Sequence, residues 1–184
     1  MKKSYLSAII IAFMVVIAVA SGGSDKEKST TDTETTSGKE DEPKSKWSYG
    51  QEDDKMEGTT NYFATLESTN KPKFKFPYNG GATLSLTVRN MEGKNDVYLY
   101  LDKGQIPISI YNSESIKFKF DDGKAINYSY SSATGAMNSY AFFSKNKELI
   151  TKIKAAKKIM IEVPVFDEGK VVFEFDAEGL VWDK

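Results

Sequence analysis

The chain has 184 residues with 25 basic and 26 acidic side chains, and it contains neither cysteine nor histidine. The missing residue types exclude disulfides, zinc, copper or haem sites built on Cys or His, and the Ser-His-Asp and Cys-His catalytic arrangements. A near-neutral charge and a single arginine, Arg89, argue against a nucleic-acid partner, because such proteins usually present a basic, arginine-bearing face.

Residues 1–20 have the layout of a secretory signal peptide. Lys2 and Lys3 precede an apolar run, and the small residues at 18–20 form an A-x-A cleavage signal. The run is shorter than the roughly 20 apolar residues that a membrane-spanning helix needs, so cleavage is favoured over a retained anchor. No cysteine follows the run, which excludes lipidation. We expect a periplasmic or extracellular protein that contacts a membrane only if this segment is uncleaved.

Residues 21–46 form a polar linker. They are built from Ser, Thr, Gly, Lys, Asp and Glu and contain no large apolar side chain. Such a composition buries too little surface to offset the entropy lost on ordering, so we expect disorder. The linker either spaces the domain from a membrane or wall, or is a passive connection between signal and domain.

Beyond the linker, aromatic and β-branched residues recur at short intervals with turn signals between them, which is typical of antiparallel β-domains. In the segment 95–104, Leu99 and Leu101 lie on one face of a strand, with Tyr98 and Tyr100 on the opposite face. The predicted strands are 59–69, 82–90, 95–104, 105–111, 115–121, 124–130, 159–166 and 170–176.

These strands predict a mainly β domain over 47–184, an antiparallel β-sandwich or open barrel. One segment departs from the alternation: 144–158 carries Leu149, Ile150 and Ile153 at helical spacing behind Ser144, a predicted N-cap. We therefore expect one amphipathic helix near the C-terminus. The predicted core includes Leu84, Leu86, Leu99, Leu101, Phe118, Phe120, Val172 and Phe175.

Two acidic turn sequences, "FDDGK" at 120–124 and "FDEGK" at 166–170, raise the question of a metal or catalytic site. Each separates two alternating runs, and glycine supplies the positive φ that tight hairpin turns require. A calcium loop needs about six oxygen ligands in a patterned run, which neither segment has. The turn interpretation is sufficient, so we predict no metal, no cofactor and no catalytic residue here.

Two alternatives stay open. Carboxylates from distant strands, such as Asp54 with Asp121 or Asp176, could form the acid pair of a hydrolase acting on envelope glycan. The ten tyrosines and the segment "KFKFPY" at 73–78 could bind carbohydrate by ring stacking. Neither pattern has a distinctive spacing, since acids and aromatics are abundant throughout the domain.

Short motifs are spread over the domain in a recognisable order, with a leading Trp, a short Asp/Met segment, a strand that ends in Arg and a closing "FDAEGL" at 175–180. The positions, expected to be structural, are Trp47, Asp54, Met56, Arg89, Asp121, Phe175, Asp176, Gly179 and Leu180. This order resembles a loose group of exported bacterial β-sandwich domains that includes the VasI-type accessory proteins of type VI secretion. That resemblance implies export and a sandwich fold, but no ligand and no reaction. VasI-type sequences usually carry a cysteine pair, and this chain carries none.

The sequence thus predicts an exported bacterial envelope protein that is not an enzyme. We expect its domain to act as a binding or accessory module for another envelope protein. The oligomeric state does not follow from the pattern.

Overall fold

The computed structural model describes residues 45–107, 115–132 and 139–184. The predicted signal segment and nearly all of the linker lie outside these residues. Eleven strands and one helix are present in the described ranges: β1 (Ser48–Asp54), β2 (Thr59–Glu67), β3 (Lys73–Phe74), β4 (Gly80–Gly81), β5 (Leu84–Met91), β6 (Lys94–Leu101), β7 (Ser115–Phe120), β8 (Ile126–Ser131), β9 (Tyr140–Phe143), α1 (Asn146–Ala155), β10 (Lys158–Val165) and β11 (Gly169–Asp176).

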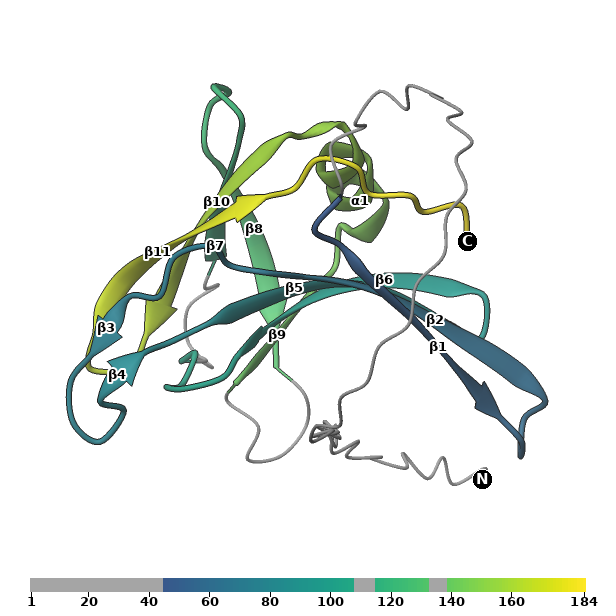
Figure 1. Cartoon of the computed structure of the whole chain (residues 1–184), viewed down its shortest axis with the longest axis horizontal. Helices are drawn as coiled ribbons and strands as arrows, with labels where there is room; N and C mark the ends of the chain where they lie inside the picture. The colour runs from purple at the N-terminus through teal and green to yellow at the C-terminus, as the bar shows by residue number, and fades with distance from the viewer. Residues whose placement is uncertain (1–44, 108–114, 133–138) are drawn as a thin grey trace, which may run out of the picture. The chain divides into compact units, whose positions relative to one another are not determined.

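Nine of the strands form one antiparallel sheet in the order β1-β2-β5-β6-β9-β8-β7-β10-β11, and β3 pairs with β4 in a small separate hairpin. The long sheet folds over, so that β10 and β11 cross the strands of the other half (Figure 1). Its outer strands, β1 and β11, do not pair with each other, so the described strands form a sandwich-like fold and not a closed barrel. The predicted fold class, mainly β with a single helix near the C-terminus, is confirmed.

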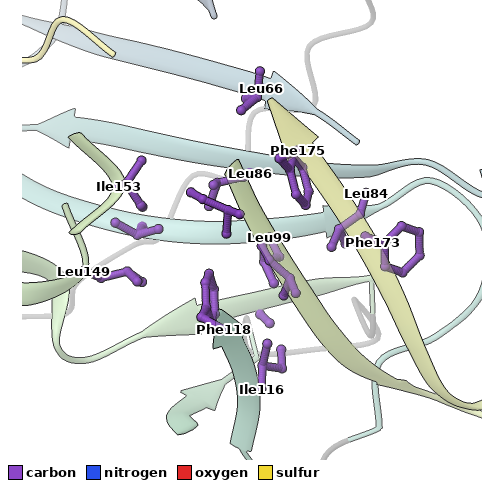
Figure 2. Close-up of a cluster of buried hydrophobic side chains, with 14 of the residues drawn as sticks. Leu66, Leu84, Leu86, Leu99, Ile116, Phe118, Leu149, Ile153, Phe173 and Phe175 are labelled. Atoms are coloured by element: carbon purple, nitrogen blue, oxygen red, sulfur yellow. The ribbon is translucent and has the colours of Figure 1, made fainter. Parts of the chain in front are cut away.

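The core lies between the two halves of the folded sheet. Leu84, Leu86 and Leu99 from β5 and β6 face Phe118 and Phe173 from β7 and β11, and all five are fully buried (Figure 2). The register explains this arrangement, since Leu86 pairs with Leu99 across the strands and places both side chains on the same face. Alternation along each strand therefore builds the core, as predicted.

Two of the predicted core residues behave differently. Val172 is 36% exposed because it lies on the face of β11 opposite to Phe173 and Phe175. Its prediction as a core residue is wrong, because the two consecutive valines of that strand, Val171 and Val172, point to opposite faces. Phe120 is only partly buried at the end of β7, where it stacks on Phe118 with ring centroids 5.9 Å apart.

Helix α1 begins and ends inside the predicted segment. Its N-cap is Lys145, which makes no side-chain capping bond, so the prediction of Ser144 as N-cap is wrong. The Asn146 side chain instead accepts a hydrogen bond from Val97 N at 3.1 Å and ties the first turn to β6. Leu149 and Ile153 are buried against the sheet, which confirms the predicted apolar face.

The predicted strand 105–111 is not formed over 105–107, and its remaining residues lie outside the described ones. Both predicted hairpins are present, since β7 pairs with β8 and β10 with β11. In the first turn, however, the positive φ belongs to Asp121, at 46°, and not to Gly123. Gly123 is required for a different reason: a Cβ there would lie 2.9 Å from the carbonyl oxygen of Phe120.

The depth of Phe118 predicts a large effect on stability. Phe118→Ala should lower the free energy of unfolding by about 3–5 kcal/mol, because it leaves a cavity in a closed core. Phe120→Ala should cost clearly less, since its ring already contacts solvent at the end of the strand. Urea unfolding of both variants measures the difference, and equal losses would contradict the placement of Phe120 at the rim.

Tyr128 predicts how stability changes at alkaline pH. Its hydroxyl donates to Glu148 Oε1 at 3.0 Å, and burial together with that carboxylate raises the pKa of Tyr128 to about 12. The folded state therefore holds this proton more tightly than the unfolded state, whose tyrosines have a pKa near 10. The stabilisation is complete below about pH 10 and is lost as the pH rises towards about 12. Denaturation across this range should show a shallower decline for Tyr128→Phe, and parallel curves would contradict the assignment.

Candidate functional site

The acids of the two predicted turns serve the backbone. Asp121 Oδ1 accepts hydrogen bonds from the backbone N–H groups of Lys157 and Lys158, at 3.0 and 2.8 Å. These bonds fix the connection between α1 and β10 to the end of β7. Glu168 Oε1 likewise accepts from Lys75 N at 2.6 Å and holds the β3–β4 connection.

These turns are far apart. Asp121 N bonds to the carbonyl of Lys158, the first residue of β10, whereas Asp167 follows the last residue of that strand. A strand of 8 residues separates the two ends, and at ~3.3 Å per residue they are about 25 Å apart. The structure therefore does not bring the two acidic turns into one site.

The carboxylates considered for a hydrolase pair are also engaged elsewhere. Asp54 Oδ1 accepts from Met56 N at 2.9 Å and Glu57 N at 3.1 Å, which closes the β1–β2 turn. Asp176 forms an ion pair with Lys46, and this ammonium lowers the pKa of Asp176. Among the described residues, no group of three or more acidic side chains is arranged to hold a metal ion.

Adjacent acids in one turn offer a matched test of this structural role. Asp121→Ala should lower the free energy of unfolding by about 1–3 kcal/mol, because two backbone donors lose their acceptor and alanine is strained at positive φ. Asp122→Ala should change it by less than about 0.5 kcal/mol, as exposed positions usually do. Urea unfolding compares the two variants, and similar costs at both positions would refute the role of Asp121.

Three of the positions that suggested the predicted resemblance lie where the start of the domain meets its end. Trp47 is buried, and its indole N–H donates to the carbonyl of Ala177 at 2.9 Å. Asp176 pairs with Lys46, and Gly179, with a φ of 87°, lies so close to Ser45 that a Cβ would contact that side chain at 3.0 Å. We name this contact the terminal clasp; Phe175 and Leu180, two further positions of the predicted motif, are buried in the core.

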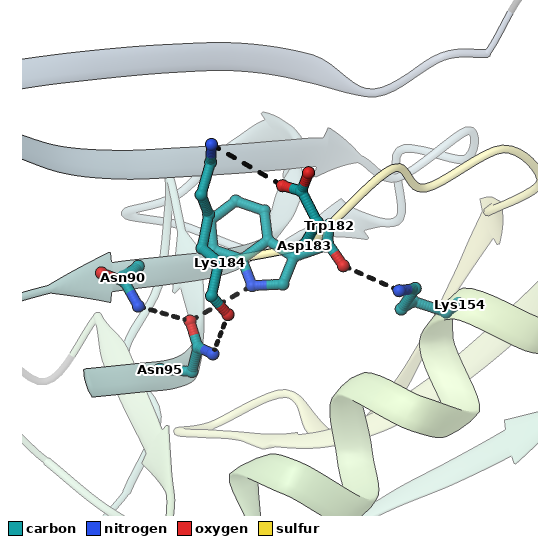
Figure 3. Close-up of polar contacts among 6 residues, drawn as sticks. All are labelled: Asn90, Asn95, Lys154, Trp182, Asp183 and Lys184. Carbon is teal, nitrogen blue, oxygen red and sulfur yellow. Dashed lines mark hydrogen bonds and ion pairs between the residues drawn. The ribbon is translucent and has the colours of Figure 1, made fainter. Parts of the chain in front are cut away.

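The C-terminal segment continues the clasp across β5 and β6. Asn95 Oδ1 accepts from Asn90 Nδ2 at 2.9 Å and from the Trp182 indole N–H at 3.2 Å (Figure 3). The Asn95 amide donates to the carbonyl of Lys184 at 2.7 Å, and Lys154 of α1 donates to the carbonyl of Trp182 at 2.7 Å. These bonds connect the chain end, the β5–β6 hairpin and the helix, so their role is structural.

The remaining motif positions are scattered. Asp54 and Met56 lie at the β1–β2 turn, and Met56 is 93% exposed. Arg89 lies on the outer face of β5, where its Nε donates to Asp96 Oδ1 at 3.0 Å. The positions of the predicted motif therefore lie mainly in the clasp, the core and the turns, and Arg89 is the member that lies on an open sheet face.

Arg89 borders a group of aromatic rings on that outer face. Its guanidinium lies over the rings of Tyr98 and Phe142, with centroid distances of 5.2 and 5.8 Å. Tyr98 pairs with Phe142 and Tyr100 with Tyr140 across β6 and β9, opposite to the buried Leu99 and Ala141. We name this group the aromatic face; its residues are Arg89, Tyr98, Tyr100, Tyr140 and Phe142.

The rings of the aromatic face contact one another across β6 and β9. The centroids of Tyr100 and Tyr140 are 4.8 Å apart, and those of Tyr98 and Phe142 are 5.3 Å apart. Each of the four rings is partly buried. Rigid strands and ring contacts thus hold an amphipathic surface in one conformation, which lowers the entropy lost when a partner binds.

Burial raises the pKa of two phenols of the aromatic face, Tyr98 and Tyr140. For Tyr98, a hydrogen bond to Thr87 and the charge of Arg89 oppose the shift. For Tyr140, the neighbouring Tyr100 and Tyr98 add to it. The hydroxyls of Tyr98 and Tyr140 therefore keep their protons at neutral pH and act as hydrogen-bond donors and acceptors.

The sequence predicts the position of two of the four rings of the aromatic face. The alternation in 95–104 placed Tyr98 and Tyr100 on the face opposite the core, but β9 was not predicted. Its four residues, Tyr140–Phe143, are too few for a clear period and precede the helix directly. The pairing of β9 with β6, which joins Tyr140 and Phe142 to the face, depends on tertiary structure.

Comparison with models of protein families, with characterised proteins and with solved structures finds no match to this chain. The likeness to the exported β-sandwich group therefore stays a prediction. Within the described residues, no helix is long and apolar enough to span a membrane.

Proposed function

We propose that this chain is an exported bacterial envelope protein whose domain binds another envelope protein and performs no catalysis. The aromatic face is the proposed contact surface. Tyrosine and arginine are the residue types that contribute most often to the energy of protein interfaces, and here they form one contiguous group.

The arrangement of Arg89 supports a protein partner. Its guanidinium is paired with Asp96 and stacked on Tyr98, and its side chain is 23% exposed. The charge is thus satisfied before binding, so a partner can cover it without leaving a buried ion unpaired. Polar side chains lie beside the rings on β2 and β5, where Thr65 and Thr87 hydrogen-bond at 3.1 Å.

The proposal of a non-catalytic role is supported by the use of the acids. Asp54, Asp121 and Glu168 bind backbone N–H groups, and Asp176 pairs with Lys46. A carboxylate-dependent hydrolase needs two acids whose environments push their pKa values apart. Asp54, Asp121 and Glu168 instead stabilise turns and connections between strands, whereas Asp122 is exposed.

Carbohydrate binding is the second candidate for the same surface. Tyr100 and Tyr140 present phenol rings beside Ser85, which lies opposite Tyr100 in the β5–β6 register. Rings flanked by hydroxyls are suited to stack on a sugar and hydrogen-bond to it. A glycan would be the ligand if the photocrosslinking experiment below finds no protein partner and a soluble envelope glycan binds over the rings of Tyr100 and Tyr140.

Site-specific photocrosslinking tests the protein-binding proposal. The full chain carries benzoylphenylalanine in place of Tyr100 and is expressed in its native cells. We expect one discrete crosslinked protein partner, because Tyr100 lies within the aromatic face. The same photoreactive residue in place of Met160, which is 39% exposed on β10, should give no such product.

A second variant measures how much the face contributes. Tyr140→Ala should weaken binding of the crosslinked partner at least about tenfold, the effect of losing one interface hot spot. Val172→Ala, on the exposed side of β11, is the matched control and should leave the affinity unchanged. Equal crosslinking from both positions, or unchanged binding by Tyr140→Ala, would reject the aromatic face as the contact surface.

A further inference from the structure

Two phenylalanines are exposed at the same end of the sheet. Phe76 is 81% and Phe166 is 65% exposed, which makes them the most exposed aromatic side chains of the described residues. Phe76 lies in the β3–β4 connection and Phe166 in the β10–β11 connection, and these connections lie side by side in Figure 1. We name them together, residues 71–81 and 166–170, the phenylalanine tip.

Hydrogen bonds join the two connections across a separation of more than ninety residues. Lys75 N donates to Glu168 Oε1 at 2.6 Å, and Lys75 Nζ lies 3.4 Å from the carbonyl oxygen of Asp167. Phe166 N donates to the carbonyl of Gln105 at 2.8 Å. The residue before Phe76 and the backbone of Phe166 are thus both held by hydrogen bonds. Both exposed rings therefore belong to segments with a defined backbone conformation.

The tip is also anchored to the core. Phe74, two residues before Phe76, is 6% exposed. Its ring packs so close to Gly104 that a Cβ there would lie 3.0 Å away. The chain therefore buries one phenylalanine and exposes the next in the same short segment.

Cations surround the exposed rings. The tip and the neighbouring 102–105 loop carry five lysines and three acids, a local excess of positive charge. Two of the acids bind backbone N–H groups, since Asp102 Oδ1 accepts from Thr83 N at 2.7 Å and Glu168 accepts from Lys75 N. The lysines are exposed: Lys71, Lys73, Lys75, Lys103 and Lys170. Lys170 also pairs with Glu162 at 3.6 Å, and Lys103 Nζ donates to the carbonyl of Gly81 at 3.3 Å, so Lys71, Lys73 and Lys75 contribute most of the available charge.

We propose that the phenylalanine tip docks on an anionic lipid surface. Phe76 and Phe166 enter the interfacial layer of the bilayer, while the lysine ammonium groups contact lipid phosphates. Phenyl rings carry no polar atom that needs a partner, and flexible lysines adapt to mobile headgroups. This chemistry fits a lipid surface better than the Tyr- and Arg-rich aromatic face does.

Membrane docking through the phenylalanine tip is a different interaction from the proposed protein contact and does not depend on it. The tip and the aromatic face use different residues, so a domain docked through Phe76 and Phe166 leaves Tyr100 and Tyr140 available to a protein. Membrane contact through the tip also does not require the N-terminal apolar segment. It therefore adds a second membrane contact to the one expected from an uncleaved signal.

A single fluorescent label tests the proposal in the full chain. Because the sequence contains no cysteine, Asp167→Cys provides a unique attachment site at the tip, and Met56→Cys provides one at the exposed β1–β2 turn. Asp167 has a φ of 61°, a conformation that strains a cysteine, so a thermal melt first establishes that the Asp167→Cys protein is folded. Each protein is mixed with phosphatidylcholine vesicles that contain phosphatidylglycerol and nitroxide-labelled lipid. We expect quenching of the label at position 167 and much weaker quenching at position 56.

The two exposed rings are then removed together. Phe76→Ser with Phe166→Ser in the Asp167→Cys chain should reduce the lipid-dependent quenching at least about tenfold at limiting lipid. The N-terminal segment is the same in every protein, so it cannot produce this difference. A thermal melt should be unchanged, since exposed substitutions rarely alter stability.

Replacing phosphatidylglycerol with phosphatidylcholine separates the two parts of the interaction. We expect several-fold weaker quenching at position 167, because the lysine contribution is lost. Equal quenching at positions 167 and 56, retention of quenching without the two phenylalanines, or indifference to the anionic lipid would each overturn the proposal. Protein crosslinking at Tyr100 reports on the aromatic face separately, so failure of one proposal leaves the other standing.

Discussion

The contacts of Phe118 with Tyr128 and Phe143 hold the domain together at the point where its sheet folds over. Ring centroids lie 5.4 and 5.2 Å from that of Phe118, in edge-to-face geometry that aromatic pairs favour. Within the described ranges, the strands that meet there, β8 and β9, pair at Tyr130 with Phe143 and at Ser131 with Phe142. The buried rings therefore add side-chain packing to the backbone pairing at the point where the sheet turns. A chain without cysteine has no covalent substitute for this core.

The two outer strands of the folded sheet, β1 and β11, contact different parts of the chain. On β11, Asn70 and Thr69 occupy the outer backbone groups: Asn70 Nδ2 donates to the carbonyl of Val172, and Glu174 N donates to Asn70 Oδ1. This side chain imitates a neighbouring strand and blocks further pairing. The terminal clasp seals the region beside β1 through Trp47 and Ala177. Trp47, a position of the predicted motif, thus contributes to the fold at the edge of the domain.

Periodicity was sufficient to predict the strands that build the core, because a strand with one wet face alternates along its whole length. β5, β7, β10 and β11 lie within two residues of their predicted bounds, and β6 ends three residues before its predicted end at 104. β1 was missed because Ser48–Asp54 carries almost no apolar residue and becomes a strand only by pairing with β2. The error at Val172 has a related origin, since two adjacent valines leave the buried face ambiguous. Of the surfaces proposed to bind, the sequence contained half of the aromatic face and the segment at 73–78, but no signal that Phe76 and Phe166 lie at one end.

The polar and aromatic side chains of this domain favour a binding role over acid-dependent catalysis. Asp121 and Asp54 each use one carboxylate oxygen, Oδ1, to hold two backbone N–H groups, which is a structural role. Exposed aromatic rings that form a contiguous patch are, by contrast, a feature of interaction surfaces. The fold has room to bury large rings, as Phe118 and Phe173 show at 0% exposure. Rings that remain outside that core while being braced by hydrogen bonds, as at the tip, or by ring contacts, as on the aromatic face, are therefore where a partner gains most by binding.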